Sequence, residues 1–283
     1  MREIEKEVSR IVDFIRKCVN DYGFRGAVLG VSGGIDSAVV LGLLIRALDR
    51  DRILALILPE RDSSKRSLRD AQRVCKHFGV VPQVYSITGA LRALGAYKLF
   101  PPAFLIPEKL KQIYARNRWN RYEDPYIMDL LNEGDELFLK GLAYYRVKHR
   151  VRMCKLYMEA EKRKYCVVGT TNRTEQLLGL YVKWGDDSVD IEPIMHLYKV
   201  EVYEMAKYLG VPTYIIEKAP TPDLVPGIVD EEAFGLTYAE IDSILMDLEK
   251  GIEREGPAVE RIKKIITSTK LRELKCLHLE RGE

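Results

Sequence analysis

Apolar residues along this chain follow two alternating patterns. Continuous apolar runs predict buried strands at residues 28–31, 52–59 and 165–169, and a further strand is predicted at residues 82–87. Apolar residues at three- and four-residue spacing predict helices, which fall at residues 3–22, 36–48, 68–78, 144–160, 199–209, 239–249 and 258–266. Because buried strands alternate with helices, the pattern predicts an α/β fold in which helices flank a doubly wound, mainly parallel sheet.

Residues 95–140 interrupt this alternation. The stretch contains several prolines and a basic, aromatic run at 115–122, and it shows neither a strand nor one clean helix. We interpret it as an inserted lid or small helical subdomain within a single domain that spans residues 1–283. The run at 115–122 has the composition of a nucleic-acid stacking surface. A cover over an active site or a subunit contact is the favoured interpretation.

Composition places the chain among globular proteins and argues against several other classes. Hydrophobic residues make up 47% of the 283 residues, and no apolar run approaches the length of a membrane span. The formal net charge of +3 is too small to indicate nucleic-acid binding by itself. The charged start does not resemble a signal peptide, and the five cysteines lack C-x-x-C spacing. We therefore expect a cytoplasmic protein with reduced cysteines and no membrane contact.

The helix predicted at 144–160 is strongly basic. Its apolar stripe is predicted to consist of Val147, Val151, Cys154 and Met158. The remaining positions carry Arg146, Lys148, His149, Arg150, Arg152 and Lys155. An isolated helix of this kind presents its basic face to solvent. This one leads directly into the strand at 165–169, which brings its basic residues close to the end of a buried strand.

The turn between the first strand and the helix at 36–48 is the most informative stretch. It consists of Gly30, Val31, Ser32, Gly33, Gly34, Ile35, Asp36 and Ser37. Its glycines let an anion approach the backbone, the helix N-terminus offers unpaired N–H groups, and the two serines add hydroxyl groups. The combination predicts a phosphate-binding loop, although a ligand-free glycine turn is the alternative.

Asp36 is the unexpected member of this turn, because a carboxylate repels phosphate unless a cation lies between them. Its position predicts a Mg²⁺ ion held partly by Asp36 and partly by phosphate oxygens. A second hydroxyl-rich turn with an acid, from Thr170 to Glu175, follows the strand at 165–169. The charged segment at 183–194 and the proline-rich segment at 221–230 have the composition of substrate loops.

The sequence Ser32-Gly33-Gly34-Ile35-Asp36-Ser37 resembles the S-G-G-x-D-S signature of the ATP pyrophosphatases, which split ATP into AMP and pyrophosphate while adenylating a substrate. Within that superfamily the chain resembles the ammonia-dependent NAD synthetases. The further matching segments are 148–153, 168–175, 178–179, 183–186, 189–194, 197–199, 221–224, 230–231 and 235–238. The resemblance implies an adenine nucleotide α-hydrolase-like fold. It also implies a reaction in which deamido-NAD is adenylated by ATP and amidated by ammonia, giving NAD, AMP and pyrophosphate.

The resemblance also implies site residues by matching position. The implied ATP contacts are the loop from Gly30 to Ser37, Thr170, Lys199 and Thr221. The implied magnesium ligands are Asp36 and Glu175. The implied contacts to deamido-NAD are Arg150, Lys183 and Asp190. The family further implies a homodimer that takes ammonia either free or from a separate glutaminase, since we expect no glutaminase domain in this chain.

Chemical requirements give three of these residues a catalytic role. Charge on the leaving pyrophosphate must be neutralised, which Asp36 through its metal and Lys199 directly can provide. Ammonia must react as neutral NH₃, so a carboxylate that accepts a proton from ammonium is expected, and Asp190 or Asp223 is a candidate. Hydrogen bonding to substrate or capping a turn is the more ordinary role for either residue.

Several positions depart from the family's usual pattern. Arg146 stands where asparagine is usual, His149 replaces alanine, and Leu180 replaces an aromatic residue. The stretch at 269–272 is all that remains of a C-terminal His-Lys-Arg pattern, and the insert is long. Three alternatives therefore stay open: adenylation of another carboxylate, a tRNA-modifying member of the superfamily, and a nucleotide sensor without catalysis. The presence of both metal-binding acids argues against the sensor.

Overall fold

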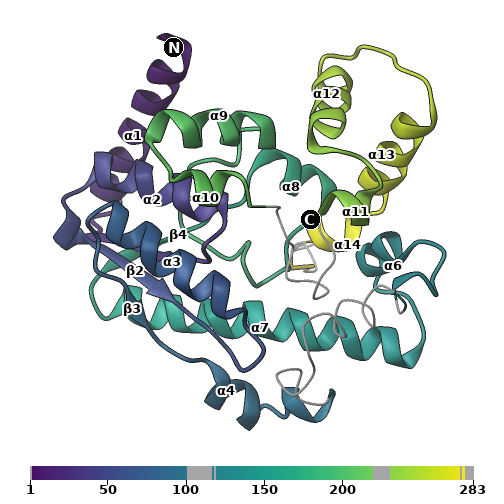
Figure 1. Ribbon diagram of the computed structural model, residues 1–283, viewed down its shortest axis with the longest axis horizontal. Coiled ribbons are helices and arrows are strands. Elements are labelled where there is room, and N and C mark those ends of the chain that lie inside the picture. Colours follow the sequence, from purple (N-terminus) through teal and green to yellow (C-terminus); the bar gives the residue numbers. More distant parts are fainter. Residues whose placement is uncertain (1, 101–116, 118, 219–229, 275, 278–283) are drawn as a thin grey trace, which may run out of the picture.

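Four parallel strands form the sheet at the centre of the fold (Figure 1). They are β1 (Gly26–Gly30), β2 (Ile53–Ile57), β3 (Gln83–Val84) and β4 (Tyr165–Val168), and their order across the sheet is β3-β2-β1-β4. Val28 of β1 lies opposite Leu54 of β2 on one side and Val167 of β4 on the other. The computed structural model describes residues 2–100, 117, 119–218, 230–274 and 276–277. The predicted α/β fold with a parallel sheet is confirmed.

Helices surround this sheet and extend beyond it. The helices of the first half are α1 (Arg2–Asp21), α2 (Ile35–Ala47), η1 (Arg50–Arg52), α3 (Lys65–His77), α4 (Thr88–Ala93), η2 (Ala96–Lys98), α6 (Pro125–Leu131) and α7 (Glu136–Glu161). Those of the second half are α8 (Arg173–Leu178), α9 (Lys199–Leu209), α10 (Thr213–Ile216), α11 (Asp230–Phe234), α12 (Tyr238–Glu249), α13 (Pro257–Thr267) and α14 (Lys270–Glu273). No helix in the described part of the chain is both long and apolar enough to cross a membrane.

The strands β1, β2 and β4 bury both of their faces, which explains their continuous apolar runs. Ala27 and Leu29 of β1 join a core with α1, α2, α3 and α9 on one face of the sheet. Val28, between them, points to the opposite face and joins a core with α4 and α7. Successive side chains of a strand alternate between faces, so one run of apolar residues supplies two cores.

A third core lies apart from the sheet and is entirely helical. It is formed by side chains of α6, α8, α11, α12 and α13, including Tyr126, Leu178, Phe234 and Ile241. We call these five helices with α14 the C-terminal lobe, which stands beside the sheet in Figure 1. Trp119 of the basic, aromatic run packs against this core, and the Tyr122 hydroxyl donates to Asp135. Arg116 and Arg118 lie outside the described residues.

Helix α7 differs from its prediction in length and in orientation. It begins at Glu136 rather than at 144, because the Asp135 side chain caps it by accepting from the backbone N–H of Phe138 (2.7 Å). The predicted apolar stripe is wrong in part: Val147 and Val151 pack against the core that contains Val28, whereas Cys154 and Met158 are exposed. The buried residues are instead Phe138, Leu142, Tyr145, Met153, Leu156, Glu159 and Ala160. Both stripes have helical spacing, and the true one rotates His149 and Arg152 inward.

A buried ionic cluster joins α6, α7 and α14. Asp129 accepts hydrogen bonds from Arg272 (Nη2, 2.5 Å), from Arg146 (Nη2, 2.9 Å) and from the Tyr145 hydroxyl. Arg146 and Arg272 belong to two of the segments in which the sequence departs from its resembled family. The structure therefore gives these departures a shared role: they hold the C-terminal end of the lobe against α7.

Replacing Asp129 by alanine is expected to lower the free energy of unfolding by about 3–5 kcal/mol, because it leaves two guanidinium groups together without their counter-ion. Urea denaturation measures this loss. Asp13→Ala is the matched control, since Asp13 is 76% exposed and pairs with Arg16 at 3.4 Å. We expect its effect to be below about 0.5 kcal/mol. Equal effects of the two substitutions would contradict a structural role for the cluster.

Candidate nucleotide site

The turn between β1 and α2 is held in shape by its own serines. The Ser32 Oγ accepts from the Gly34 N–H (3.2 Å), and the Ser37 Oγ donates to the Gly34 carbonyl (3.0 Å). The two hydroxyl oxygens lie 3.1 Å apart. Gly33 has a φ of +79°, and a Cβ there would lie 2.6 Å from the Ser67 carbonyl oxygen of α3. Only glycine both adopts this positive φ readily and leaves room for the Ser67 carbonyl. Because α3 packs so closely against Gly33, it helps to fix the shape of the loop.

Gly33→Ala is expected to weaken nucleotide binding at least about tenfold and to cost more than about 2 kcal/mol of stability, because it combines left-handed strain with a backbone clash. Gly210→Ala separates the left-handed backbone strain from the backbone clash. Gly210 has a φ of +77°, but nothing lies within 4 Å of a Cβ placed there. It should lose only about 1 kcal/mol of stability and leave nucleotide affinity unchanged. Calorimetry and thermal unfolding test both variants; unchanged affinity in Gly33→Ala would refute the assigned loop geometry.

Two carboxylates and one lysine from three helices meet beside this turn. The Lys199 Nζ donates to the Asp36 Oδ2 (2.7 Å) and to the Glu175 Oε1 (3.0 Å). Lys199 is the first residue of α9 and its side chain is only 1% exposed, whereas those of Asp36 and Glu175 are 18% and 16% exposed. We call these residues the acid–lysine cluster. The structure thus brings together three of the residues predicted for ATP and metal binding.

Asn172 orients both carboxylates and is absent from the predicted site. Its side-chain N–H donates to the Asp36 Oδ1 (2.9 Å), while its Oδ1 accepts from the Glu175 backbone N–H (3.0 Å). The Glu175 carboxylate in turn accepts from the Asn172 backbone N–H (3.3 Å), which completes a capping box at the start of α8. The Asn-x-x-Glu spacing is a sequence signal for such a cap and could have identified Asn172.

Two members of the acid–lysine cluster, Glu175 and Lys199, have shifted pKa values. Burial raises the pKa of Glu175, and the nearby Asp36 carboxylate acts in the same direction, although Lys199 opposes both. Burial alone would lower the pKa of Lys199, but the charges of Asp36 and Glu175 outweigh it and raise that pKa. The lysine is therefore held as an ammonium ion inside the fold.

The acids of this cluster fit a magnesium ion that is shared with a ligand. No group of three or more potential metal-ligating His, Cys, Asp or Glu side chains occurs in the described residues. Magnesium typically uses one or two carboxylates plus phosphate oxygens and water, rather than a cage made entirely of protein. Asp36 and Glu175, both at the wall of a cavity, match that requirement.

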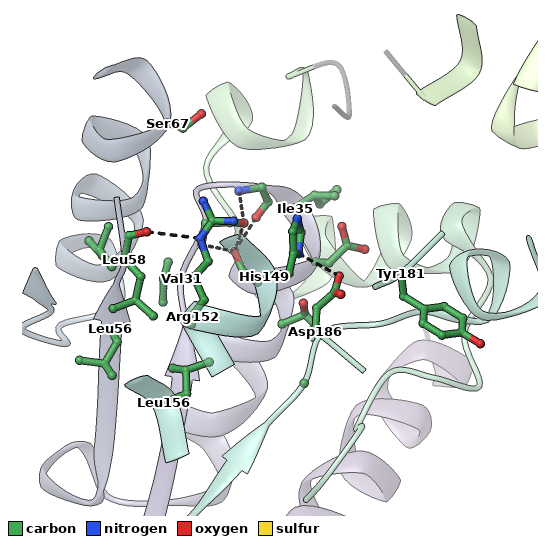
Figure 2. Close-up of a pocket in the computed structure, with 18 of the residues that line it drawn as sticks. Val31, Ile35, Leu56, Leu58, Ser67, His149, Arg152, Leu156, Tyr181 and Asp186 are labelled. Carbon is green, nitrogen blue, oxygen red and sulfur yellow. Dashed lines mark hydrogen bonds and ion pairs between the residues drawn. The ribbon is translucent and has the colours of Figure 1, made fainter. Parts of the chain in front are cut away.

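The loop and the acid–lysine cluster open into one cavity of about 340 Å³ (Figure 2). Of the predicted residues, those that line it are Gly30, Val31, Ser32, Gly34, Ile35, Asp36, Ser37, Thr170, Glu175 and Lys199. Apolar side chains from β2 and α7 form another part of the wall, namely Leu56, Leu58, Met153 and Leu156. A polar loop next to an apolar wall matches the two halves of a nucleotide, its phosphates and its base.

The predicted substrate contacts lie outside this lining. Arg150 is exposed and donates to the Lys183 carbonyl through Nε (3.3 Å) and Nη2 (3.2 Å), so these two residues are neighbours. The Asp190 carboxylate accepts from the Val167 N–H (2.7 Å) and from the Tyr157 hydroxyl (3.2 Å). Thr221 and Asp223 lie outside the described residues. The roles of Arg150, Lys183, Asp190 and Thr221 remain predictions.

Several further charged residues line the cavity and were not predicted as site residues. The His149 Nδ1 faces the Asp186 Oδ2 at 3.5 Å, and His149 lowers the pKa of Asp186 against the opposing effect of burial. Burial raises the pKa of Asp230 to about 6, and the Tyr238 hydroxyl donates to it (2.6 Å). Lys218 and Arg152 complete this group. His149, Arg152 and Asp186 all lie in segments that match the resembled family.

The fold and this site together define a nucleotide-binding α/β enzyme of the ATP pyrophosphatase type: a parallel sheet, a Ser-Gly-Gly loop and two acids facing one cavity. The sequence pattern of the NAD synthase family matches residues 7–120 and 123–275. This chain belongs to the NAD synthase family. The predicted family and its enzyme class, a ligase, are confirmed.

Individual relatives agree with this assignment. An NH₃-dependent NAD⁺ synthetase of Thermotoga neapolitana is 60% identical over 260 residues, which cover 90% of this chain and 90% of that protein. The structure of an NH₃-dependent NAD synthetase of Campylobacter jejuni is 27% identical with a TM-score of 0.70, covering 98% of this chain and 99% of that one. An NMN synthetase of Francisella tularensis is 28% identical with a TM-score of 0.75 and the same coverage.

Proposed function

We propose that this protein is an ammonia-dependent NAD synthetase, which adenylates the carboxylate of deamido-NAD with ATP and converts the adenylate to NAD with ammonia. The observation that carries the proposal is the acid–lysine cluster, which lies beside the phosphate-binding loop and opens with it into one cavity. Family membership and the 60% identical relative named for this activity support the same reaction.

Each part of the cavity has a defined task in this reaction. The backbone and hydroxyl groups of the loop from Gly30 to Ser37 bind the phosphates that leave as pyrophosphate. Asp36 and Glu175 would hold Mg²⁺, which when bound neutralises phosphate charge and favours departure of pyrophosphate. Lys199 keeps the two acids together and adds a fixed positive charge beside the loop. Because these charged groups are already in position before the substrate binds, they need to move little when charge develops in the transition state.

We propose that deamido-NAD, the acceptor of the adenylyl group, binds next to the cavity at residues that do not line it. Arg150 and Lys183 are held side by side by two hydrogen bonds, and both carry the charge that a dinucleotide phosphate requires. Asp190 stays the proposed proton acceptor for ammonium. Because Arg150 and Asp190 are exposed, we further propose that a second copy of the chain completes this binding site in a homodimer. Light scattering after size exclusion tests that assembly, and a monomer at micromolar concentration would refute it.

One assay separates the proposed function from its alternatives. The protein is incubated with ATP, Mg²⁺, ammonium and deamido-NAD, and NAD and pyrophosphate are measured together. Equal amounts of both products are expected, with neither formed when any component is omitted. A parallel reaction replaces deamido-NAD by nicotinate mononucleotide, because the Francisella tularensis relative is named an NMN synthetase. Pyrophosphate release with the mononucleotide or another carboxylate, but not with deamido-NAD, would overturn the proposed acceptor.

We also propose that the protein acts in the cytoplasm on free ammonia or on ammonia from a separate glutaminase. Replacing ammonium by glutamine in the same assay should abolish NAD formation by the purified chain. NAD formation from glutamine alone would contradict this part of the proposal.

A further inference from the structure

The basic residues that line the cavity differ in how their charges are balanced. Lys199 contacts two carboxylates, Lys218 faces Asp70 (3.4 Å), and His149 faces Asp186 (3.5 Å). Arg152 is the exception. Within the described part of the chain it forms no ion pair, and its one hydrogen bond runs from Nε to the Leu58 carbonyl (3.3 Å). A guanidinium has five N–H donors, so most of its donors are not used by Leu58.

The position of Arg152 is as informative as its charge. It projects from α7 into the cavity, where its Nε donates to the Leu58 carbonyl, and it lines the cavity together with His149 and with Val31 of the loop (Figure 2). The apolar wall made by Leu56, Leu58, Met153 and Leu156 lies on one side of it. Its guanidinium therefore stands where the apolar wall meets the phosphate-binding loop.

We propose that the Arg152 guanidinium binds the α-phosphate of the nucleotide. This proposal rests on the proposed function, in which Arg152 was given no role. In ATP, the α-phosphate connects the nucleoside to the terminal phosphates, just as Arg152 connects the apolar wall to the loop. A planar guanidinium also matches two phosphate oxygens at once, while its Nε remains bonded to Leu58.

This placement gives Arg152 a role in both chemical steps. In the first step a carboxylate oxygen bonds to the α-phosphorus while the bond from that phosphorus to the pyrophosphate oxygen breaks. In the second step ammonia bonds to the acyl carbon while the bond from that carbon to the phosphate oxygen breaks, so that AMP leaves and the nitrogen releases one proton to water. The α-phosphate is present in ATP, in the adenylate and in AMP. Arg152 accordingly contacts every nucleotide form, whereas the loop contacts pyrophosphate only until it leaves.

Two substitutions distinguish this role from a structural one. Arg152→Gln keeps an N–H donor for Leu58 but removes the charge, and Arg152→Lys keeps the charge but loses the planar fork. Calorimetry with AMP should show an affinity about 10- to 100-fold lower for Arg152→Gln, and an intermediate loss for Arg152→Lys. Affinity for magnesium pyrophosphate should change by less than about threefold in both. Arg163→Gln, at an ion pair with Glu159, is the control and should bind AMP like the parent.

The possible results separate failure of this proposal from failure of the proposed function. If Arg152→Gln binds AMP like the parent in a protein that still makes NAD, the α-phosphate contact is refuted. A raised KM for deamido-NAD in that variant would assign Arg152 to the acceptor instead. Equal loss of AMP and pyrophosphate affinity, or a lowered unfolding temperature, would give Arg152 a structural role and also refute the proposal. If the parent protein neither binds AMP nor forms NAD, both fail together.

Discussion

Replacing Asp36 by alanine is expected to reduce pyrophosphate release by about 10³-fold or more while leaving the fold intact. The carboxylate is a proposed magnesium ligand and lies at the first turn of α2, beside the phosphate-binding loop. Its loss still leaves Lys199 paired with Glu175, so no buried charge is stranded. The free energy of unfolding should therefore fall by no more than about 1.5 kcal/mol.

A magnesium titration adds a second measurement to this prediction. Asp36→Asn keeps the shape of the side chain and an oxygen ligand but removes the charge, so it should retain some activity and require more magnesium than the parent. Asp13→Ala removes an exposed acid far from the cavity and should leave turnover unchanged. Pyrophosphate release by Asp36→Ala within tenfold of the parent rate would show that Asp36 is not a metal ligand in the reaction.

Replacing Lys199 by methionine is expected to damage both activity and stability, in contrast to Asp36→Ala. The side chain is almost fully buried, and methionine fills most of its volume without its charge. Asp36 and Glu175 are then left facing each other without a counter-ion, which should cost about 3–5 kcal/mol of unfolding free energy. Pyrophosphate release should fall by at least about 100-fold, because the fixed positive charge beside the loop is lost. Urea denaturation and a pyrophosphate assay measure the two effects.

A double variant tests the cause of the instability. Adding Glu175→Gln to Lys199→Met removes one of the two stranded carboxylates, so we expect about half of the lost stability to return. Activity should not return, because the double variant lacks a proposed metal ligand as well as the lysine. If Lys199→Met unfolds within about 1 kcal/mol of the parent, the lysine does not balance the buried acids.

The sheet and the phosphate-binding loop are predictable because their signals are local. A strand that is buried on both faces needs a continuous apolar run, and the loop needs glycine at Gly33 with hydroxyl groups at Ser32 and Ser37. The strand β3 is less predictable: the strand predicted at 82–87 forms only over Gln83–Val84, an exposed pair at the edge of the sheet. Edge strands receive less of the burial that makes a pattern visible.

The inward face of α7 could not be predicted from spacing alone. Two apolar stripes on this helix have the same periodicity, and tertiary packing against β1 and β4 selects the one with Met153 and Leu156. His149 and Arg152 turn inward as a consequence. Basic residues are expected on a solvated face, so their presence at the cavity is visible only once the orientation of the helix is known.

The cluster around Asp129 shows a second limit of sequence analysis. Arg146 and Arg272 are 126 positions apart along the chain (272 − 146), and each stands out only as a departure from its family's usual pattern. Their common partner lies in a segment without clear periodicity. Long-range ion pairs leave no local signal, so only the structure shows that Arg146 and Arg272 meet at Asp129.

Helix α8 links the acid–lysine cluster to the other helices of the C-terminal lobe, and this link has a thermodynamic consequence. At its first turn it presents Glu175 through the capping box, while at its last residue the Leu178 carbonyl accepts from the buried Tyr126 hydroxyl (2.9 Å). A helix of six residues has no room for a hinge, so displacing the lobe must displace the carboxylate. Free energies of binding are reciprocal. Any contact that steadies the lobe is therefore expected to tighten binding in the cavity, and a ligand bound in the cavity is expected to slow hydrogen exchange in α12 and α13.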